Sequence, residues 1–133
     1  MHTLPGIADD GLIAGTSFGP LTLPISRAAN ERYWASAGVD HPTLRAGALY
    51  PPIAANLTIL ALQTVVDQAL LQTAQRIVCH RRADADVELT VSGSITERYE
   101  KRGRDYVVAT AEVTLPDGDA LWTSVATFCA AGA

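Results

Sequence analysis

The sequence contains little cysteine, few aromatic residues and no motif for a bound nucleotide or metal. Only two cysteines, Cys79 and Cys129, occur among 133 residues, and they form neither a CxxC pair nor a zinc-ligand spacing. Each lies in an apolar run typical of a strand, so we predict two buried, chemically inert thiols. Because no glycine-rich phosphate loop and no cluster of metal ligands is present, we expect no nucleotide or metal cofactor.

Signals for export, membrane insertion and nucleic-acid binding are also lacking. No basic stretch followed by an apolar run opens the chain, so the expected location is cytoplasmic. The longest apolar stretch, residues 53–71, carries Asp67, and a carboxylate inside a bilayer is costly. We therefore predict a buried helix there and no membrane span. A formal charge of −4 disfavours contact with a phosphate backbone.

The composition instead favours one folded domain. A hydrophobic share of 48% in 133 residues is sufficient for a core. Residues 1–133 are predicted to form a single domain, in which the glycine-containing residues 1–15 are a loose leader. An edge strand is predicted over 20–25, because proline is confined to the edges of sheets. Ser26 is a plausible N-cap for a short helix over 27–37, and Gly38 ends that helix.

A long helix and an antiparallel meander are predicted to follow. After a loop over 38–50, Pro51 and Pro52 open a helix over about 52–74 that is apolar around most of its circumference, which indicates that other structure surrounds it. Alternating polar and apolar residues then predict strands over 76–80, 87–96, 107–115 and 121–128. Hairpin turns are expected at 100–105 and 116–119.

This order of elements predicts an α+β hot-dog fold, in which an antiparallel sheet wraps around a long central helix. The sheet has one face to bury, and the long helix is the only element apolar enough to cover it. A single domain of this kind leaves a sheet edge open, so we expect an oligomer.

Three segments carry a resemblance to a known family. They are residues 30–38 (NERYWASAG), residues 49–52 (LYPP) and residues 95–104 (ITERYEKRGR). Their order and spacing resemble the MaoC-like hydratases and dehydratases over about residues 18–130. The resemblance is to the half-domain that lacks the catalytic motif in two-domain members. It implies a substrate that is an acyl thioester of coenzyme A or of a carrier protein's pantetheine.

The resemblance also implies where the catalytic residues of active members would fall. Those members carry Gly-Asp-x-Asn-Pro-x-His in the loop after the short helix, and the Asp and His move the protons of water addition. When Gly38 and Pro42 are aligned to this motif, the Asp position is Val39 and the His position is Leu44. Active members also resemble Ala-His-Gly at the start of the central helix, where this chain has Tyr50-Pro51-Pro52.

Two interpretations follow for the chemistry. In the first, the chain has no catalytic pair, forms part of the acyl pocket, and acts as a homodimer or as a heterodimer with a catalytic MaoC-like subunit. In the second, Asp40 and His41 have shifted by about a residue and act as base and acid. The predicted substrate-binding residues are Tyr33, Trp34, Gly47 and Tyr50, with Arg81 and Arg82 as anchors for phosphate groups.

Two further functions remain open from the sequence. The first is a hot-dog thioesterase, which would need a carboxylate near the start of the central helix. Asp67 is the only carboxylate in the predicted helix, and it lies far from that start. The second is a binding or scaffolding subunit without turnover of its own.

Overall fold

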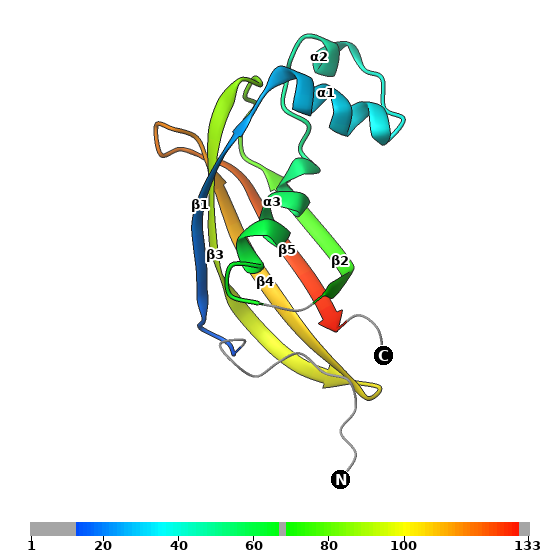
Figure 1. Ribbon diagram of the computed structural model, residues 1–133, viewed down its shortest axis with the longest axis vertical. Coiled ribbons are helices and arrows are strands. Elements are labelled where there is room, and N and C mark those ends of the chain that lie inside the picture. The colour runs from blue at the N-terminus through cyan, green and yellow to red at the C-terminus, as the bar shows by residue number, and fades with distance from the viewer. Residues whose placement is uncertain (1–12, 67–68, 131–133) are drawn as a thin grey trace.

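The computed structural model describes residues 13–66 and 69–130. Most of the predicted leader and Asp67, the carboxylate considered for a thioesterase, lie outside the described residues. Five strands form one antiparallel sheet in the order β1-β3-β4-β5-β2. The strands are β1 (Ser17–Ile25), β2 (Leu70–Cys79), β3 (Val87–Lys101), β4 (Arg104–Thr114) and β5 (Ala120–Ala130). The sheet curves around α3 (Ile53–Leu62), as Figure 1 shows.

The inner face of the sheet follows the predicted alternation. On β4, Val107, Ala109, Ala111 and Val113 are all fully buried, while Glu112 between the last two is exposed. On β5 the same face carries Trp122, Ser124, Ala126 and Phe128, each at most 1% exposed. Successive side chains of a strand point to opposite faces, so this pattern places one continuous apolar surface against α3. The predicted meander and its buried face are confirmed.

The predicted hairpin turns are confirmed too. Arg102 and Gly103 join β3 to β4 with φ values of +52° and +76°. Positive φ at both central residues gives the turn whose twist matches that of the flanking strands. The second turn, after β4, contains Gly118 at φ +89°. Strand β1 lies at one edge of the sheet and contains Pro20 and Pro24, as the proline rule predicts.

The central helix is shorter than predicted. It ends at Leu62, and residues 70–74 of the predicted helix belong instead to strand β2, which is paired with β5. The expected helix over 52–74 and the short strand over 76–80 are therefore wrong in their boundaries. Thr64, Val65 and Val66 are consecutive β-branched residues, which lose side-chain freedom in a helix and favour its end. The apolar residues beyond them suit an edge strand equally well, which sequence periodicity alone does not distinguish.

One side of α3 is not covered. The helix contacts all five strands and buries Ile53, Leu57 and Ala61, yet Leu60 is 41% exposed. The expectation of a helix surrounded on every side is thus wrong for the single chain. Within the two described ranges, no helix is long and apolar enough to cross a membrane.

The edge strand β2 also exposes apolar side chains. Leu71 is 51% exposed and Val78 is 42% exposed on this strand, which pairs only with β5. Cys79, the last residue of β2, is exposed, whereas Cys129 on β5 is buried. The prediction of a buried thiol is confirmed for Cys129 and wrong for Cys79, because an edge strand leaves the side chains at its end unprotected.

Two short helices stand at one end of the sheet. Helix α1 (Arg27–Ser36) begins at Ser26, whose hydroxyl accepts a hydrogen bond from the Ala29 N–H at 3.1 Å, as predicted. Helix α2 (Pro42–Arg45) follows after Gly38, whose φ is +73°. Together they form an overhang beside the start of α3 (Figure 1).

Candidate functional site

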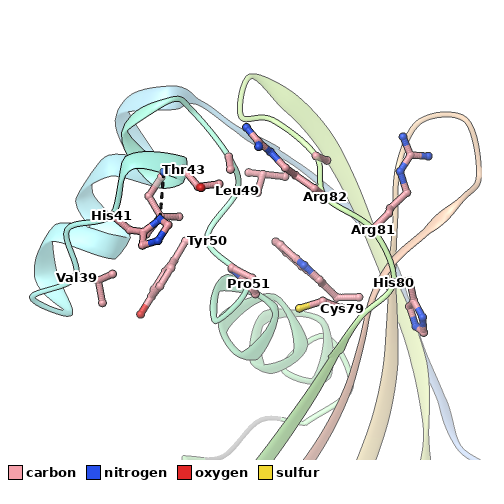
Figure 2. Close-up of a pocket in the computed structure, with 14 residues that line it drawn as sticks. Val39, His41, Thr43, Leu49, Tyr50, Pro51, Cys79, His80, Arg81 and Arg82 are labelled. Carbon is pink, nitrogen blue, oxygen red and sulfur yellow. Dashed lines mark hydrogen bonds between the residues drawn. The ribbon is translucent and has the colours of Figure 1, made fainter.

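A cavity of about 540 Å³ lies beneath this overhang. One wall comes from the chain between α1 and α3, and the opposite wall comes from the end of β2 and the residues after it (Figure 2). Its volume is within the range of small-molecule sites. The lining residues are Val39, His41, Thr43, Leu44, Ala48, Leu49, Tyr50, Pro51, Cys79, His80, Arg81, Arg82, Ala83 and Trp122.

The first wall is held in place by strand-like pairing. The N–H of Leu49 donates to the carbonyl of Ala83 at 2.9 Å, and the N–H of Ala85 donates to the carbonyl of Gly47 at 2.8 Å. These bonds connect the segment before α3 to the segment after β2. The two walls of the pocket are therefore joined at their upper end, which fixes the pocket's shape.

The positions that align with the family's catalytic pair both face this pocket. Val39 and Leu44, which the sequence alignment predicts at the Asp and His positions, both line the cavity. Neither side chain carries a group that transfers a proton. The loop therefore presents apolar groups to the cavity at both of these positions.

The start of α3 offers no free hydrogen-bond donor. Pro51 and Pro52 have no N–H, and the next N–H groups are already bonded. Ile53, Ala54 and Ala55 donate to the carbonyls of Tyr50, Pro51 and Pro52 at 3.0, 2.9 and 3.1 Å. A helix start that stabilises negative charge on a thioester oxygen needs an exposed N–H. This helix start therefore cannot hold that oxygen with its backbone.

Of the two predicted catalytic side chains, only that of His41 reaches the cavity. Asp40 is not among the residues that line the cavity. Its carboxylate forms an ion pair with Arg45 at 2.9 Å and its side chain is 69% exposed. His41 does line the cavity and caps α2, because its Nδ1 accepts the Thr43 N–H at 3.1 Å. The two residues make no hydrogen bond to one another in the described part of the chain.

The capping contact determines the tautomer of His41. A ring nitrogen that accepts a hydrogen bond carries no proton, so the neutral imidazole is protonated at Nε2. In this arrangement the ring's remaining nitrogen is a donor and not a base. Figure 2 shows the ring beside Tyr50 on the wall below α2.

The predicted phosphate anchors lie on the opposite wall. Arg81 lines the cavity and pairs with Asp119 at 2.7 Å and with Asp117 at 3.4 Å. Arg82 lines it too and has one weaker contact, to Asp84 at 3.4 Å, with 60% of its side chain exposed. Solvent screens the exposed pair of Arg82, which keeps much of its capacity to attract an anion, whereas two carboxylates already neutralise Arg81. The second basic cluster, residues 101–104, lies at the opposite end of the sheet (Figure 1).

Of the four other predicted binding residues, only Tyr50 lines this cavity. The Tyr33 hydroxyl accepts a hydrogen bond from Asn56 at 2.6 Å, and this residue lines a separate surface hollow. Trp34 has a buried indole nitrogen without a hydrogen-bond partner among the described residues. Gly47 has φ +101° and lies against the guanidinium of Arg27, so it serves a turn beside the pocket.

Sequence reasoning missed several lining residues. Cys79 and Trp122 enter the pocket from β2 and β5. Trp122 lies in a strand that alternation predicts, but no sequence signal indicates that this residue borders a cavity. In the described ranges, no group of three or more His, Cys, Asp or Glu side chains is arranged to hold a metal ion.

Comparisons with known proteins rest on the fold. No family model matches the sequence, and no curated protein matches it significantly. A solved structure of the C-terminally truncated HadBC (3R-hydroxyacyl-ACP dehydratase) complex from Mycobacterium tuberculosis superposes with a TM-score of 0.73. The two chains are 23% identical, and the match covers 88% of this chain and 96% of that one.

Two further solved structures have a similar fold. The MaoC-like dehydratase from Rhodospirillum rubrum gives a TM-score of 0.69 at 16% identity, covering 93% of this chain and 95% of that chain. The unliganded R-hydratase PhaJ1 from Pseudomonas aeruginosa also gives 0.69, at 17% identity, covering 90% and 82%. The predicted fold and the predicted resemblance are thereby confirmed at the level of structure: the chain has the hot-dog fold that MaoC-like dehydratases and R-hydratases share.

Proposed function

We propose that this chain is an acyl-thioester-binding subunit of a MaoC-like hydratase or dehydratase, and that a partner subunit supplies the acid and the base. The observation that carries the proposal is the pair Val39 and Leu44. Both line the cavity, and the sequence resemblance aligns them with the catalytic Asp and His of active members. A water-addition site needs one group to activate water and another to protonate carbon, and these side chains do neither.

The shape and lining of the cavity support the thioester as ligand. Leu44, Leu49 and Trp122 give it apolar walls suited to an acyl chain. Arg82 stands on one wall with 60% of its side chain exposed, which suits a phosphate of coenzyme A or of a carrier protein's pantetheine arm, and Arg81 lies beside it in ion pairs with Asp117 and Asp119.

The start of α3 supports the proposal that the partner subunit supplies the catalytic groups. Its first N–H groups are either absent at proline or bonded to carbonyls within the turn. The polarisation of the thioester oxygen would therefore come from the partner's helix. A two-subunit arrangement has a parallel in the HadBC structure, which is described as a dehydratase complex.

The test is a hydration assay of the purified chain on a panel of enoyl-CoA thioesters, measured by the loss of absorbance of the conjugated thioester. We expect no turnover by the chain alone, in protein shown to be folded. Calorimetric titration with octanoyl-CoA should still detect binding. Adding a catalytic MaoC-like subunit should restore turnover above that subunit's own rate on long acyl chains.

Turnover by the chain alone would overturn the proposal and favour the second interpretation. In that case Asp40→Ala and His41→Ala should each abolish activity, because acid and base are both required. Release of free thiol without hydration would instead indicate a thioesterase.

A further inference from the structure

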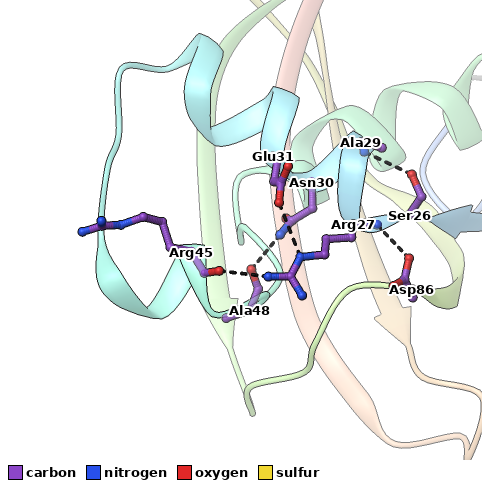
Figure 3. Close-up of polar contacts among 8 residues, drawn as sticks. All are labelled: Ser26, Arg27, Ala29, Asn30, Glu31, Arg45, Ala48 and Asp86. Atoms are coloured by element: carbon purple, nitrogen blue, oxygen red, sulfur yellow. Dashed lines mark hydrogen bonds and ion pairs between the residues drawn. The ribbon is translucent and has the colours of Figure 1, made fainter.

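Asn30 is completely buried on α1, yet it is not among the residues that line the pocket. A fully buried amide requires partners for both of its polar ends, because an unpaired buried polar group is costly. Figure 3 shows its side chain reaching from α1 toward the segment that precedes α3.

The amide of Asn30 binds alternate residues of the pocket wall. Its Nδ2 donates to the carbonyl of Ala48 at 2.8 Å, and its Oδ1 accepts the N–H of Tyr50 at 2.9 Å. Leu49, between them, uses its N–H on the other side, toward Ala83 at 2.9 Å. The wall segment is therefore hydrogen-bonded along both edges, by backbone on one side and by one side-chain amide on the other.

A primary amide has a donor and an acceptor in one plane, so it replaces the partner strand that this edge lacks. A carboxylate accepts but does not donate, so it would leave the Ala48 carbonyl unsatisfied. A shorter hydroxyl cannot reach both atoms. The two hydrogen bonds to Ala48 and Tyr50 therefore require asparagine at position 30, whereas helix formation by α1 does not.

We propose that Asn30 is a positioning residue for the thioester pocket: it sets Ala48, Leu49 and Tyr50 at the distance from β2 that the ligand requires. The inference rests on the proposed function. It also extends that function, because it makes the affinity of the pocket depend on a residue that does not touch the ligand. Arg27 braces the same overhang from α1, since its Nη2 donates to the Arg45 carbonyl at 3.1 Å.

The test compares Asn30→Asp and Asn30→Ser with a control, Thr58→Val. Thr58 is equally buried, and its hydroxyl bonds to the Ala54 carbonyl at 2.8 Å and to Ser124 at 3.0 Å, but it does not line the pocket. Affinity for octanoyl-CoA is measured by calorimetry well below each variant's Tm. Hydrogen exchange is followed at the amides of Leu49 and Tyr50.

We expect both Asn30 variants to bind about tenfold more weakly or worse. Exchange at the Tyr50 amide should be faster in Asn30→Ser, which loses the acceptor, whereas Asn30→Asp keeps an acceptor and loses only the donor to the Ala48 carbonyl. Thr58→Val should lose thermal stability while keeping the wild-type affinity and exchange at Tyr50. Should one Asn30 variant fail to fold, the other carries the comparison, since one adds a charge and the other removes volume.

Wild-type affinity in the folded Asn30 variants, with wild-type Tyr50 exchange in Asn30→Ser, would overturn the inference and leave the proposed function standing. If the wild-type protein binds no acyl thioester, the proposed function fails instead. In that case an unchanged Tyr50 exchange in Asn30→Ser would also reject the positioning role, whereas faster exchange would retain it for a pocket with another ligand.

Discussion

The two ring nitrogens of His41 lie in different surroundings: one caps a helix, and the other is available at the pocket wall. Nδ1 caps α2 through the Thr43 N–H, which leaves Nε2 as a donor at the pocket wall. Asparagine keeps the cap but is too short to place a donor where Nε2 lies, so this substitution distinguishes a structural residue from one that binds the ligand.

Replacing His41 with asparagine should leave stability almost unchanged, because asparagine is a good N-cap. His41→Ala removes the cap and should cost about 0.5–2 kcal/mol of unfolding free energy. If the Nε2 proton contacts the ligand, both variants should bind octanoyl-CoA about two- to tenfold more weakly. Chemical denaturation and calorimetry measure the two effects, and unchanged affinity in both variants would exclude His41 from ligand contact.

Gly93 on β3 lies where neighbouring strands leave no room for a side chain. A Cβ at this position would lie 2.1 Å from the Thr110 carbonyl oxygen and 2.8 Å from the Phe18 ring. Glycine is thus required where β1 and β4 both crowd β3.

The substitution Gly93→Ala should lower the free energy of unfolding by about 1–3 kcal/mol or more, because the crowding atoms include backbone. Ser92→Ala, at the adjacent exposed position, should change it by less than about 0.5 kcal/mol. Urea denaturation followed by circular dichroism measures both, and equal stability of the two variants would contradict the crowding argument.

At the scale of elements, β2 is an edge strand with one side unpaired in the single chain. It pairs with β5 on one side only, and it exposes Leu71 and Val78. Unpaired strand edges with apolar side chains favour pairing with another chain. The other edge strand, β1, carries two prolines that block such pairing.

Lysine at Leu71 and Val78 should therefore weaken association through β2 without unfolding the chain, because both side chains are exposed. Light scattering after size-exclusion chromatography should show a smaller species for the double variant. Ser17→Lys on β1, also exposed, is the matched control and should leave the oligomeric state unchanged. The interface assignment fails if the control and the double variant behave alike.

At the scale of the whole molecule, the exposed side of α3 and the open edge of β2 predict that the folded state is coupled to association. Ligands or partners that bind only the native state raise its apparent stability by mass action. The Tm measured by calorimetry should therefore rise with the concentration of the protein, or on addition of a catalytic partner subunit. A Tm independent of both would indicate a self-sufficient monomer.

The sequence by itself determined the meander, its two hairpins, the proline-marked edge and the cap of α1. These features depend on local rules: period-two alternation, turn residues with positive φ, and one hydroxyl at a helix start. The same local rules extended α3 too far, because an apolar run of residues fits a buried helix and an edge strand alike.

Tertiary structure alone decided which residues form the pocket. Val39, Leu44, Cys79 and Trp122 come from separate loops and strands and meet only after the sheet curves around α3. The exposure of Cys79 follows from the position of β2 at the edge, and the role of Asn30 follows from two backbone atoms 18 and 20 residues away. Long-range contacts of this kind leave no periodic signal, because they depend on how elements distant in sequence pack together.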